Sequence, residues 1–591
     1  MKKRLITTAL PYNFNDSVSS CLLLGAWCNT GRNRYDSSSS LLLEYHWNDP
    51  IKKEKDFFYL DKLRCDLTIL MAKELNKLHD VEFSTRSWQL MFGYWLNQFT
   101  SVVYDRWCMV NIALAQDADL VSQSIESDWR QLIPQDTSEA SNKFVDDVWN
   151  DSVIGYLMES WTTIRVVKDV PIEPFSVGSV FHKTEKIMRR PRIYSAKVLA
   201  KNIIRALLRF STMPGKAYVL ASPRLSIWNL LRIRWLLSGV IHYEPVFDKS
   251  PRSVFDEGMR NWSLPVHQAD GQFENIIKKM VPMWMPMSFL ESFRHNMLQV
   301  ENNEIDPDVV FSANRHCSDD VFKIWAACKI ESGCKLVVGQ HGGGPFHKYN
   351  GSVQFEREIA DLYVTLGNGN RGFDHLRDVG QFWERLSYGK WDPSGTALIV
   401  TVTCPRYTFD LRSFALSGGM LGYLDDLFSF YSNLNLHVQS ESVVRLMPND
   451  YGWKIRDRWL ERYPSAKLDN GDAPLKKMAK KARLVISTYN ATTYNESLAA
   501  NIPTIIFWDE RQWETAEWAV SDFDMLKSVG IFHETPYSAA LHVKEIWGDV
   551  AKWWFDPKVQ NARENFCRKY AYRHSSVIPK LADVLREANK V

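Results

Sequence analysis

The sequence predicts an α/β protein with two Rossmann-like domains that face a cleft. Two series of short apolar segments alternate with segments of helical periodicity, one on each side of residues 387–395. Strands that are apolar throughout are typical of a parallel sheet covered by helices on both faces. Residues 387–395 contain two glycines and a proline, so we interpret them as a linker between a domain over 1–388 and a domain over 394–591.

The overall composition excludes several other classes of protein. The chain has 591 residues, too many for one ordinary core, and its 45% apolar and 24% charged residues are usual for a globular protein. A formal net charge of +3 argues against a strongly basic nucleic-acid binder. No apolar run approaches the length of about 18 residues that a transmembrane helix needs. The nine cysteines include no CxxC pair, so we expect reduced thiols, a cytoplasmic protein and no structural zinc.

The first domain opens with a predicted strand over residues 3–10 and a helix over 19–29. Bulky apolar residues then recur every three or four positions in 56–79 and 86–117, which predicts two long helices. We expect these helices to belong to an insertion, over about 50–215, in the first domain. Further strands of this domain are predicted at residues 217–221, 308–312, 335–339 and 361–365.

A basic segment lies at the end of the predicted insertion. Residues 183–216 contain ten Lys and Arg against a single acid, Glu185, and apolar residues recur at helical spacing from Ile193 to Phe210. A basic amphipathic helix can lie on an anionic membrane surface. The alternative is a surface helix with an ordinary solvated face.

The second domain has the more regular alternation of strands and helices. Helices are predicted at 411–434, 453–461 and 493–500, and the last helix of the chain, about 560–590, is expected to cross back to the first domain. Open parallel sheets bind ligands at the carboxyl ends of their strands, so the residues that follow each strand are the candidates for a site. The strands are predicted at residues 397–403, 442–447, 482–488 and 503–508.

The segment that begins at Ser487 is the most specific motif of the sequence. A strand ends in a short polar loop that contains Asn490, and a helix begins near Thr492 and Thr493. Free N–H groups at a helix start favour a phosphate, and the threonine hydroxyls add donors. Glu496, one turn into the helix, can accept hydrogen bonds from sugar hydroxyls. The alternative is a capping box, in which Thr493 and Glu496 only close the start of the helix.

A glycine-rich turn follows the strand predicted at 335–339. Consecutive glycines expose backbone N–H groups and allow a ligand to approach closely. A neutral imidazole near pH 7 can take a proton from an attacking hydroxyl, so His341 is the candidate general base, with a structural histidine as the alternative. The candidate phosphate- or substrate-binding residues of the turn are Gln340, Gly342, Gly343, Gly344, His347 and Lys348.

Two arginines follow strands of the second domain. Arg445 ends the strand at 442–447, and Arg406 follows the strand at 397–403. A guanidinium in such a place can bind a diphosphate or a carboxylate through two parallel hydrogen bonds. The alternative is an arginine held in an ion pair at the strand end. The sequence contains no Walker loop and no HExxH motif, so we expect neither a metal nor a cofactor.

With these motifs the chain resembles a known group of proteins. The stretches LITTALP, GQHGGGPFHK, RLMPNDYGW and ISTYNATTYNESLAANIPTIIFWD are similar to those of transferases from bacterial O-antigen and surface-carbohydrate gene clusters. The resemblance runs nearly end to end and implies a role in surface-polysaccharide or lipopolysaccharide synthesis. The second half also resembles the donor domain of GT-B glycosyltransferases. This resemblance implies that Thr492, Thr493 and Glu496 face the phosphates and ribose of a nucleotide-sugar.

A second, more distant resemblance is to the teichoic-acid glycerophosphotransferases. They have a His-Gly turn followed by Pro and Lys, together with a Ser/Thr-rich loop, and the chain has QHGGGPFHK and STYNATT. In that group the histidine is the base and the transferred group is a polyol phosphate. This sequence departs from the pattern in its three glycines and in the additional His347, which leaves the role of Lys348 open.

These observations predict a GT-B-like, metal-independent glycosyltransferase. It would move a sugar from a nucleotide donor, with a CMP-linked acidic sugar as one candidate, to an O-antigen, surface-polysaccharide or lipid-linked acceptor. We expect it in the cytoplasm, at the inner face of the cytoplasmic membrane if residues 183–216 bind lipid, with no nucleic acid as partner. The alternatives are a polyol-phosphate transferase and a non-catalytic carbohydrate-binding protein with a degenerate GT-B fold.

Overall fold

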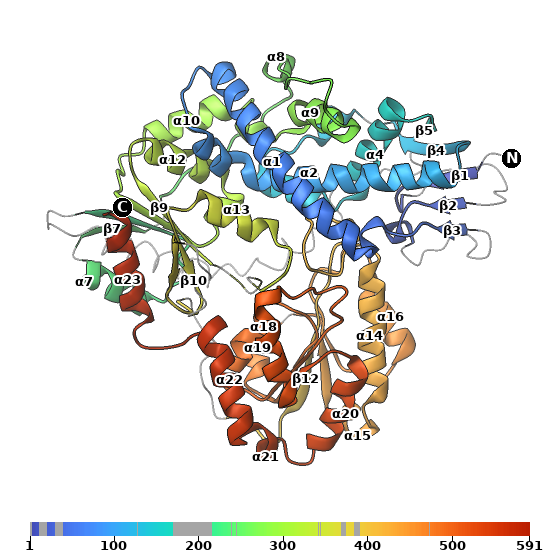
Figure 1. The fold of residues 1–591 in the computed structure, drawn as a ribbon, viewed down its shortest axis with the longest axis vertical. Helices are drawn as coiled ribbons and strands as arrows, with labels where there is room; N and C mark the ends of the chain where they lie inside the picture. Colours follow the sequence, from blue (N-terminus) through green and yellow to red (C-terminus); the bar gives the residue numbers. More distant parts are fainter. Residues whose placement is uncertain are drawn as a thin grey trace, which may run out of the picture.

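A computed structural model of the chain contains three parallel β-sheets flanked by helices (Figure 1), so the predicted α/β class is confirmed. Each sheet contains only parallel strand pairs among the described residues. The structure describes residues 3–10, 21–29, 40–126, 128–169, 216–237, 239–243, 245–340, 342, 344, 346–367, 374–382, 391–471 and 473–590.

The first sheet has five strands in the order β3-β2-β1-β4-β5 and was not predicted as a separate unit. Its first strand, Lys3–Ile6, lies in the stretch predicted as a strand at 3–10. The other strands are short, and one of them, with the sequence LVSQSI, alternates apolar with polar residues, so they were not predicted. The stretch predicted as a helix at 19–29 forms a strand and a short 3-10 helix, Ala26–Cys28. Three apolar residues do not by themselves distinguish a strand from a helix, and pairing with β1 decides here. The strands are β1 Lys3–Ile6, β2 Cys21–Leu23, β3 Ser40–Leu42, β4 Leu120–Ile125 and β5 Arg165–Asp169.

Two long helices, α1 (Pro50–His79) and α2 (Thr85–Gln116), confirm the helices predicted in this region. The Asp49 side chain caps α1 by accepting hydrogen bonds from two N–H groups of its first turn, and Ser84 caps α2. Helix α2 packs on α4 (Asp147–Trp161) beside the first sheet. It also packs on α12 (Asp320–Glu331) and α13 (Gly351–Ile359) beside the second sheet (Figure 1). The two sheets are therefore joined through one continuous apolar core.

The second sheet has six strands in the order β11-β10-β9-β8-β6-β7. The four strands predicted here match β6, β8, β9 and β10. Its strands are β6 Ala217–Ala221, β7 Val240–Tyr243, β8 Val309–Ser312, β9 Lys335–Gly339, β10 Leu362–Thr365 and β11 Leu376–Asp378. The helices between α2 and β10 are α3 Thr137–Lys143, α4, α7 Ile227–Leu237, α8 Glu257–Arg260, α9 Gln272–Trp284, α10 Phe293–Glu301, α11 Arg315–Ser318, α12 Asp320–Glu331 and α13 Gly351–Ile359.

The third sheet has six strands in the order β14-β13-β12-β15-β16-β17 and its own apolar core. Four of its strands match those predicted after the linker. The strands are β12 Thr396–Val400, β13 Ser442–Arg445, β14 Leu468–Asp469, β15 Ala482–Ser487, β16 Thr504–Phe507 and β17 Phe532–His533. The helices are α14 Gly419–Asn433, α15 Leu436–Ser440, α16 Ile455–Arg462, α17 Leu475–Ala479, α18 Thr492–Ala499, α19 Glu517–Ser528, α20 Pro536–Ile546, α21 Val550–Trp554 and α22 Pro557–Tyr570.

The last helix, α23 (Val577–Ala588), leaves the third sheet and packs on the outer face of the second sheet beside α7 (Figure 1). The side chain of Arg377 on β11 forms an ion pair with Glu587 of this helix. Gly367, after β10, lies so close to the backbone of Lys569 that a Cβ atom would overlap it. The chain therefore returns from the third sheet to the second through a closely packed crossing.

The loop between β12 and α14 holds the third sheet against the other two. Arg406 donates to the carbonyl oxygen of Trp27 at 2.8 Å and forms an ion pair with Asp147 at 2.6 Å. Asp410 accepts hydrogen bonds from Asn97 and Ser352. The loop thus contacts the first sheet, α2 and α13, which places the carboxyl end of the third sheet against the other two units.

Candidate functional site

The two most specific motifs of the sequence meet in space. The turn after β9 crosses the carboxyl end of the third sheet, where His347 Nε2 lies 2.7 Å from the carbonyl oxygen of Asn490. A Cβ atom on Gly342 would lie 3.3 Å from Thr492 Oγ1, so this turn also reaches the first residue of α18. Both segments follow parallel strands, and the loops after parallel strands gather at the carboxyl edge of their sheet.

Backbone hydrogen bonds fix the turn against the third sheet. Ala516 N donates to the Phe346 carbonyl at 2.7 Å, and Lys348 N donates to the Glu514 carbonyl at 3.0 Å. Gly344 has φ of +133°, a conformation that side chains other than glycine rarely adopt, and a Cβ atom there would lie within 3.3 Å of His347 Nδ1. The glycine therefore permits the sharp turn that brings the imidazole to Asn490.

The environment of His347 differs from that of a phosphate ligand. Its side chain is buried, and burial lowers the pKa of His347 to about 4, so the ring is neutral near pH 7. The Asn490 oxygen only accepts, so Nε2 carries the proton, and Nδ1 has no partner among the described residues. A neutral buried ring supplies no positive charge to a phosphate. In this structure His347 makes a contact that holds the turn, and the phosphate- or substrate-binding role expected for it stays a prediction.

Two further residues of the turn have partners within the protein. Lys348 Nζ forms an ion pair with Glu54 on α1 at 2.9 Å, which raises the pKa of Lys348. Gln340 is buried, and its amide donates to the Gly342 carbonyl at 2.8 Å. These contacts show what orders the turn. His341 and Gly343 lie outside the described residues, so the role expected for His341 as general base stays a prediction.

The predicted donor residues of the third sheet gather around Tyr489. The Tyr489 hydroxyl lies 2.7 Å from Thr493 Oγ1. Burial raises the pKa of Tyr489, with smaller electrostatic effects from Glu496 (raising) and Arg445 (lowering). Thr493 therefore contacts this tyrosine, and Glu496, from the same motif, and Arg445, from another strand end, lie near enough to act on it electrostatically.

The capping box considered for Thr493 and Glu496 does not form. Helix α18 begins at Thr492, its N-cap is Ala491, and no side chain caps it. Ser487 Oγ and Asn490 Nδ2 are buried and lack partners among the described residues, while Asn490 Oδ1 accepts from Tyr494. Buried polar atoms without partners are uncommon in native proteins and cost free energy, which is acceptable at a site that binds a polar ligand.

Both arginines singled out from the sequence are held in ion pairs. Arg445 pairs with Asp469 at 2.7 Å and also donates to the Ala473 carbonyl. Arg406 is buried and bridges Asp147 and Trp27, as described above. The ion-paired alternative thus describes both side chains in this structure.

The arginine that sequence reasoning missed is Arg412, in the loop between β12 and α14. Its guanidinium lies over the rings of Phe409 and Phe414, and it forms no ion pair with any described residue. It lines a cavity of about 120 Å³ together with Thr403, Ser417 and other residues of the same loop. The only available signal was its position six residues after Arg406, in the loop that follows the first strand of the second domain.

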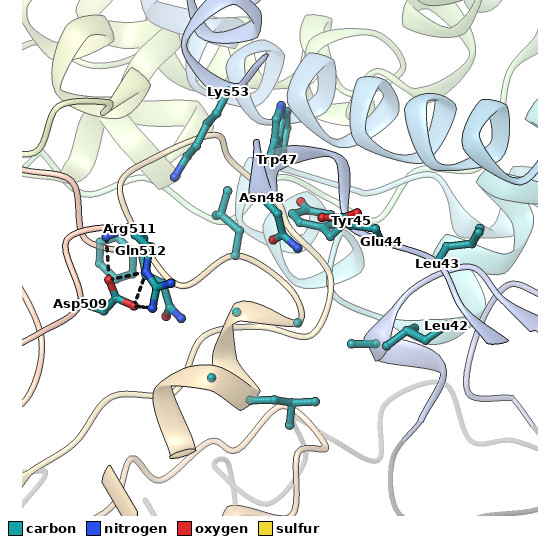
Figure 2. Close-up of a pocket in the computed structure, with 17 residues that line it drawn as sticks. Leu42, Leu43, Glu44, Tyr45, Trp47, Asn48, Lys53, Asp509, Arg511 and Gln512 are labelled. Carbon is teal, nitrogen blue, oxygen red and sulfur yellow. Dashed lines mark hydrogen bonds and ion pairs between the residues drawn. The ribbon is translucent and has the colours of Figure 1, made fainter. Parts of the chain in front are cut away.

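A larger cavity of about 520 Å³ lies between the first and third sheets (Figure 2). One side consists of residues from the end of β3 to the first turn of α1, including Tyr45, Asn48 and Lys53. The other side consists of the start of α14 and of the loop after β16, where Asp509 and Arg511 form an ion pair. Among the described residues, none of those predicted from the sequence as site residues lines this cavity. Phe414 lines both cavities and lies 5.5 Å from His347, ring centre to ring centre, so the cavities and the turn are contiguous.

Within the part of the chain that the structure describes, two groups of side chains have the donor atoms of a metal site. His316, Cys317 and Glu356 form a buried group, and Asp61, Cys65 and Glu358 a more exposed one. In the first group His316 Nε2 lies 3.3 Å from Glu356, whose other oxygen accepts from Tyr363. Hydrogen bonds account for this arrangement, and the expectation of a metal-independent enzyme stays a prediction.

A comparison with known families places the chain. The profile of the LIC12162 family transferases matches residues 3–585. The chain belongs to this family. No curated protein matches this transferase.

Solved structures similar to this transferase include MurG, a trehalose 6-phosphate synthase and WaaG. Acinetobacter baumannii MurG has 10% identity and a TM-score of 0.31, and the match covers 63% of this chain and 100% of MurG. The Burkholderia multivorans trehalose 6-phosphate synthase has 10% identity and a TM-score of 0.34, and the match covers 64% of this chain and 97% of the synthase. WaaG, a glycosyltransferase involved in lipopolysaccharide biosynthesis, has 12% identity and a TM-score of 0.27, and the match covers 62% of this chain and 99% of WaaG. Similarity at this level says nothing about function beyond the family membership.

Proposed function

We propose that this transferase moves a glycosyl group from a nucleotide-sugar to a hydroxyl group of a surface-polysaccharide, O-antigen or lipid-linked acceptor. The observation that carries the proposal is the contact between the turn after β9 and the start of α18, made by His347 with Asn490 and by Gly342 with Thr492. A base acts only within hydrogen-bond reach of the proton it removes. A donor at α18 would lie beside the turn that contains His341.

The donor would lie on the third sheet. Thr492 and the free N–H groups at the start of α18 suit a phosphate, and Glu496 suits sugar or ribose hydroxyls. Arg412 is the cation available for the remaining phosphate charge, since Arg406 and Arg445 are held in ion pairs. A single phosphate, as in a CMP-linked sugar, would need fewer cations than a diphosphate, so this donor class remains our candidate.

The acceptor would approach from the side of the first sheet. The cavity of about 520 Å³ lies between the first and third sheets and is large enough for a sugar residue with its neighbour. In this proposal His341 removes the proton of the acceptor hydroxyl as the new glycosidic bond forms, and the bond from the sugar to the donor phosphate breaks. The nucleotide leaves with the negative charge, which Arg412 and the start of α18 stabilise, and no metal is required. The enzyme would act in the cytoplasm, and its contact with a membrane is treated below.

A donor panel tests the proposal. Purified protein would be incubated with CMP-, UDP-, GDP- and CDP-linked sugars and with CDP-glycerol, and nucleotide release would be measured. We expect release from one nucleotide-sugar, a loss of at least about tenfold in Arg412→Ala, and no change in Arg586→Ala, whose exposed guanidinium pairs only with Asp583. Release from CDP-glycerol alone would instead support the polyol-phosphate transferase. Binding of glycans without release from any donor would support the non-catalytic alternative.

A further inference from the structure

Helix α7 (Ile227–Leu237) exposes an apolar face on the outside of the molecule. Trp228 is 77% exposed and Trp235 is 80% exposed, and Leu231 lies between them on the same face. These positions are three or four residues apart, which is the spacing of one helix face. Ile227 extends the face by one residue and is 43% exposed. We call these four residues the α7 face.

The opposite side of the same helix is fully used in packing. Leu230, Ile233 and Leu237 are buried in a core shared with the second sheet and α23. One side of the helix is thus packed on the protein, so poor packing of the core does not explain why the α7 face is exposed. Figure 1 places α7 and α23 at the outer edge of the second sheet, away from the third sheet. The α7 face is therefore remote from the proposed catalytic site.

The charges on α7 itself have a single sign. Arg232 lies beside Leu231 and is exposed, Arg234 is half-buried, and no residue of Ile227–Leu237 is acidic. In the sequence, the twelve Lys and Arg between residues 186 and 243 are likewise accompanied by no Asp or Glu. The acids of the neighbouring helix α23, Asp583 and Glu587, form ion pairs with Arg586 and Arg377. Isolated exposed apolar residues need no explanation, but a cluster with two tryptophans and only basic charges on its helix does.

We propose that the α7 face binds the surface of an anionic lipid bilayer. Tryptophan and leucine on one face of a helix, with arginine beside them, are the composition of helices that lie in a membrane interface. The indole rings would enter the boundary between headgroups and acyl chains, and Arg232 would stay at the level of the lipid phosphates. No helix among the described residues has the length and apolar character to cross a bilayer, so the contact is one of surface binding.

The inference does not depend on which reaction the enzyme catalyses. It assigns membrane contact to the α7 face itself, whereas the basic segment 183–216 was the basis of the sequence prediction and its residues 183–215 lie outside the described part of the chain. Arg232 and Arg234 without an acid on the same helix favour lipid phosphates over a protein partner, whose surface carries both signs of charge. A second copy of this chain and a segment of the chain itself are the other occupants that the test must detect.

Vesicle flotation with the full-length protein tests the proposal. The wild type is expected to float with vesicles of phosphatidylglycerol and phosphatidylethanolamine and not with phosphatidylcholine alone. The Trp228→Ser/Trp235→Ser variant should bind the anionic vesicles at least about tenfold more weakly. Phe58→Ser is the matched control, because Phe58 is 62% exposed on α1, and it should bind as the wild type does. Brominated acyl chains should quench part of the tryptophan fluorescence in the wild type and less in the double variant.

Three results would overturn the proposal. Equal binding by the wild type and the double variant would assign membrane contact to the basic segment alone. A wild-type dimer that the double variant converts to a monomer would show that a second copy covers the α7 face. Unfolding of the double variant at a lower temperature than Phe58→Ser would show that the tryptophans are packed by the chain itself. Nucleotide release should be equal in all three proteins, so a failure of this inference is separate from a failure of the proposed reaction.

Discussion

His347 donates its Nε2 proton to the carbonyl oxygen of Asn490 across 2.7 Å, and the two residues follow strands of different sheets. The bond joins the turn after β9 to the loop before α18. Because His347 is buried and neutral, the bond depends on neither salt nor a charged partner. This hydrogen bond therefore connects the second and third sheets close to the residues proposed to bind the donor.

Acidification should weaken the fold through His347. Its pKa is about 4 in the folded protein and 6.5 when unperturbed, so the unfolded chain binds the proton more tightly. Stability is complete above about pH 6.5 and is lost as the pH falls toward 4, by up to about 3 kcal/mol for this group. Denaturant unfolding between pH 7 and pH 4 would measure the loss.

The matched variant for this pH dependence is His347→Gln, which keeps a side-chain donor and does not titrate in this range. The pH dependence of unfolding should shrink by the contribution of one proton. It should not vanish, because burial also lowers the pKa of His79 and His533 to about 4. An unchanged slope in His347→Gln would show that His347 titrates normally.

Gly344→Ala should destabilise the turn after β9. The backbone at φ of +133° is strained for alanine, and the new methyl group would crowd Asn350 and His347. The free energy of unfolding should fall by about 1–3 kcal/mol, with a loss of nucleotide release because the turn shifts. Gly548→Ala is the control, since a Cβ atom at Gly548 meets nothing within 4 Å. Equal thermal stability of the two variants would contradict the prediction.

Glu496→Ala should affect nucleotide binding more than folding. Glu496 lies one turn into α18 and forms no capping box, so its removal does not cost the ~0.5–2 kcal/mol of stability that a cap contributes. We expect nucleotide affinity to fall by about tenfold, which is about 1.4 kcal/mol. Calorimetric titration with the nucleotide found in the donor panel, beside a thermal melt, separates the two effects. A lower melting temperature with unchanged affinity would remove Glu496 from the donor site.

His341→Ala should reduce turnover by about 10²–10⁴-fold while nucleotide binding survives, as expected for loss of a positioned base. His341→Asn distinguishes the base from an orienting group, because asparagine keeps a hydrogen bond and cannot take the proton near pH 7. Turnover close to wild type in His341→Asn would exclude the base. The measurement is the rate of transfer at saturating donor.

Asp147→Asn should loosen the attachment of the third sheet to the first. Asp147 pairs with buried Arg406 at 2.6 Å and accepts from Tyr407 at 2.6 Å. Removing one member of a buried ion pair leaves a charge uncompensated and typically costs about 3–5 kcal/mol. Asp583→Asn, which breaks the exposed pair with Arg586, should change stability by less than about 1 kcal/mol. Equal unfolding midpoints for the two variants would contradict the role of Arg406.

Local sequence patterns were enough for much of the fold. The apolar runs at β6, β8, β9 and β10 and those at β12, β13, β15 and β16 identified strands, because a parallel strand is buried on both faces and reads as a continuous apolar segment. The same rule missed β4, whose sequence LVSQSI contains three polar residues. It also missed β2, which is too short to show any period. These two strands exist because β1 supplies a partner for both, and a partner is invisible in local sequence.

The sequence by itself determined which segments follow strands and contain polar, glycine-rich or helix-starting residues, and it therefore located both the turn at 340–348 and the loop at 487–496. Tertiary structure alone decided that these segments touch, and which charges remain available. Arg406 and Arg445 follow or end strands much as Arg412 does, and the sequence does not distinguish the three. In the structure Asp147, distant in the chain, pairs with Arg406, and Asp469, on the neighbouring strand β14, pairs with Arg445. The physical reason is that an ion pair forms between residues close in space, and a sequence contains the charges without their distances.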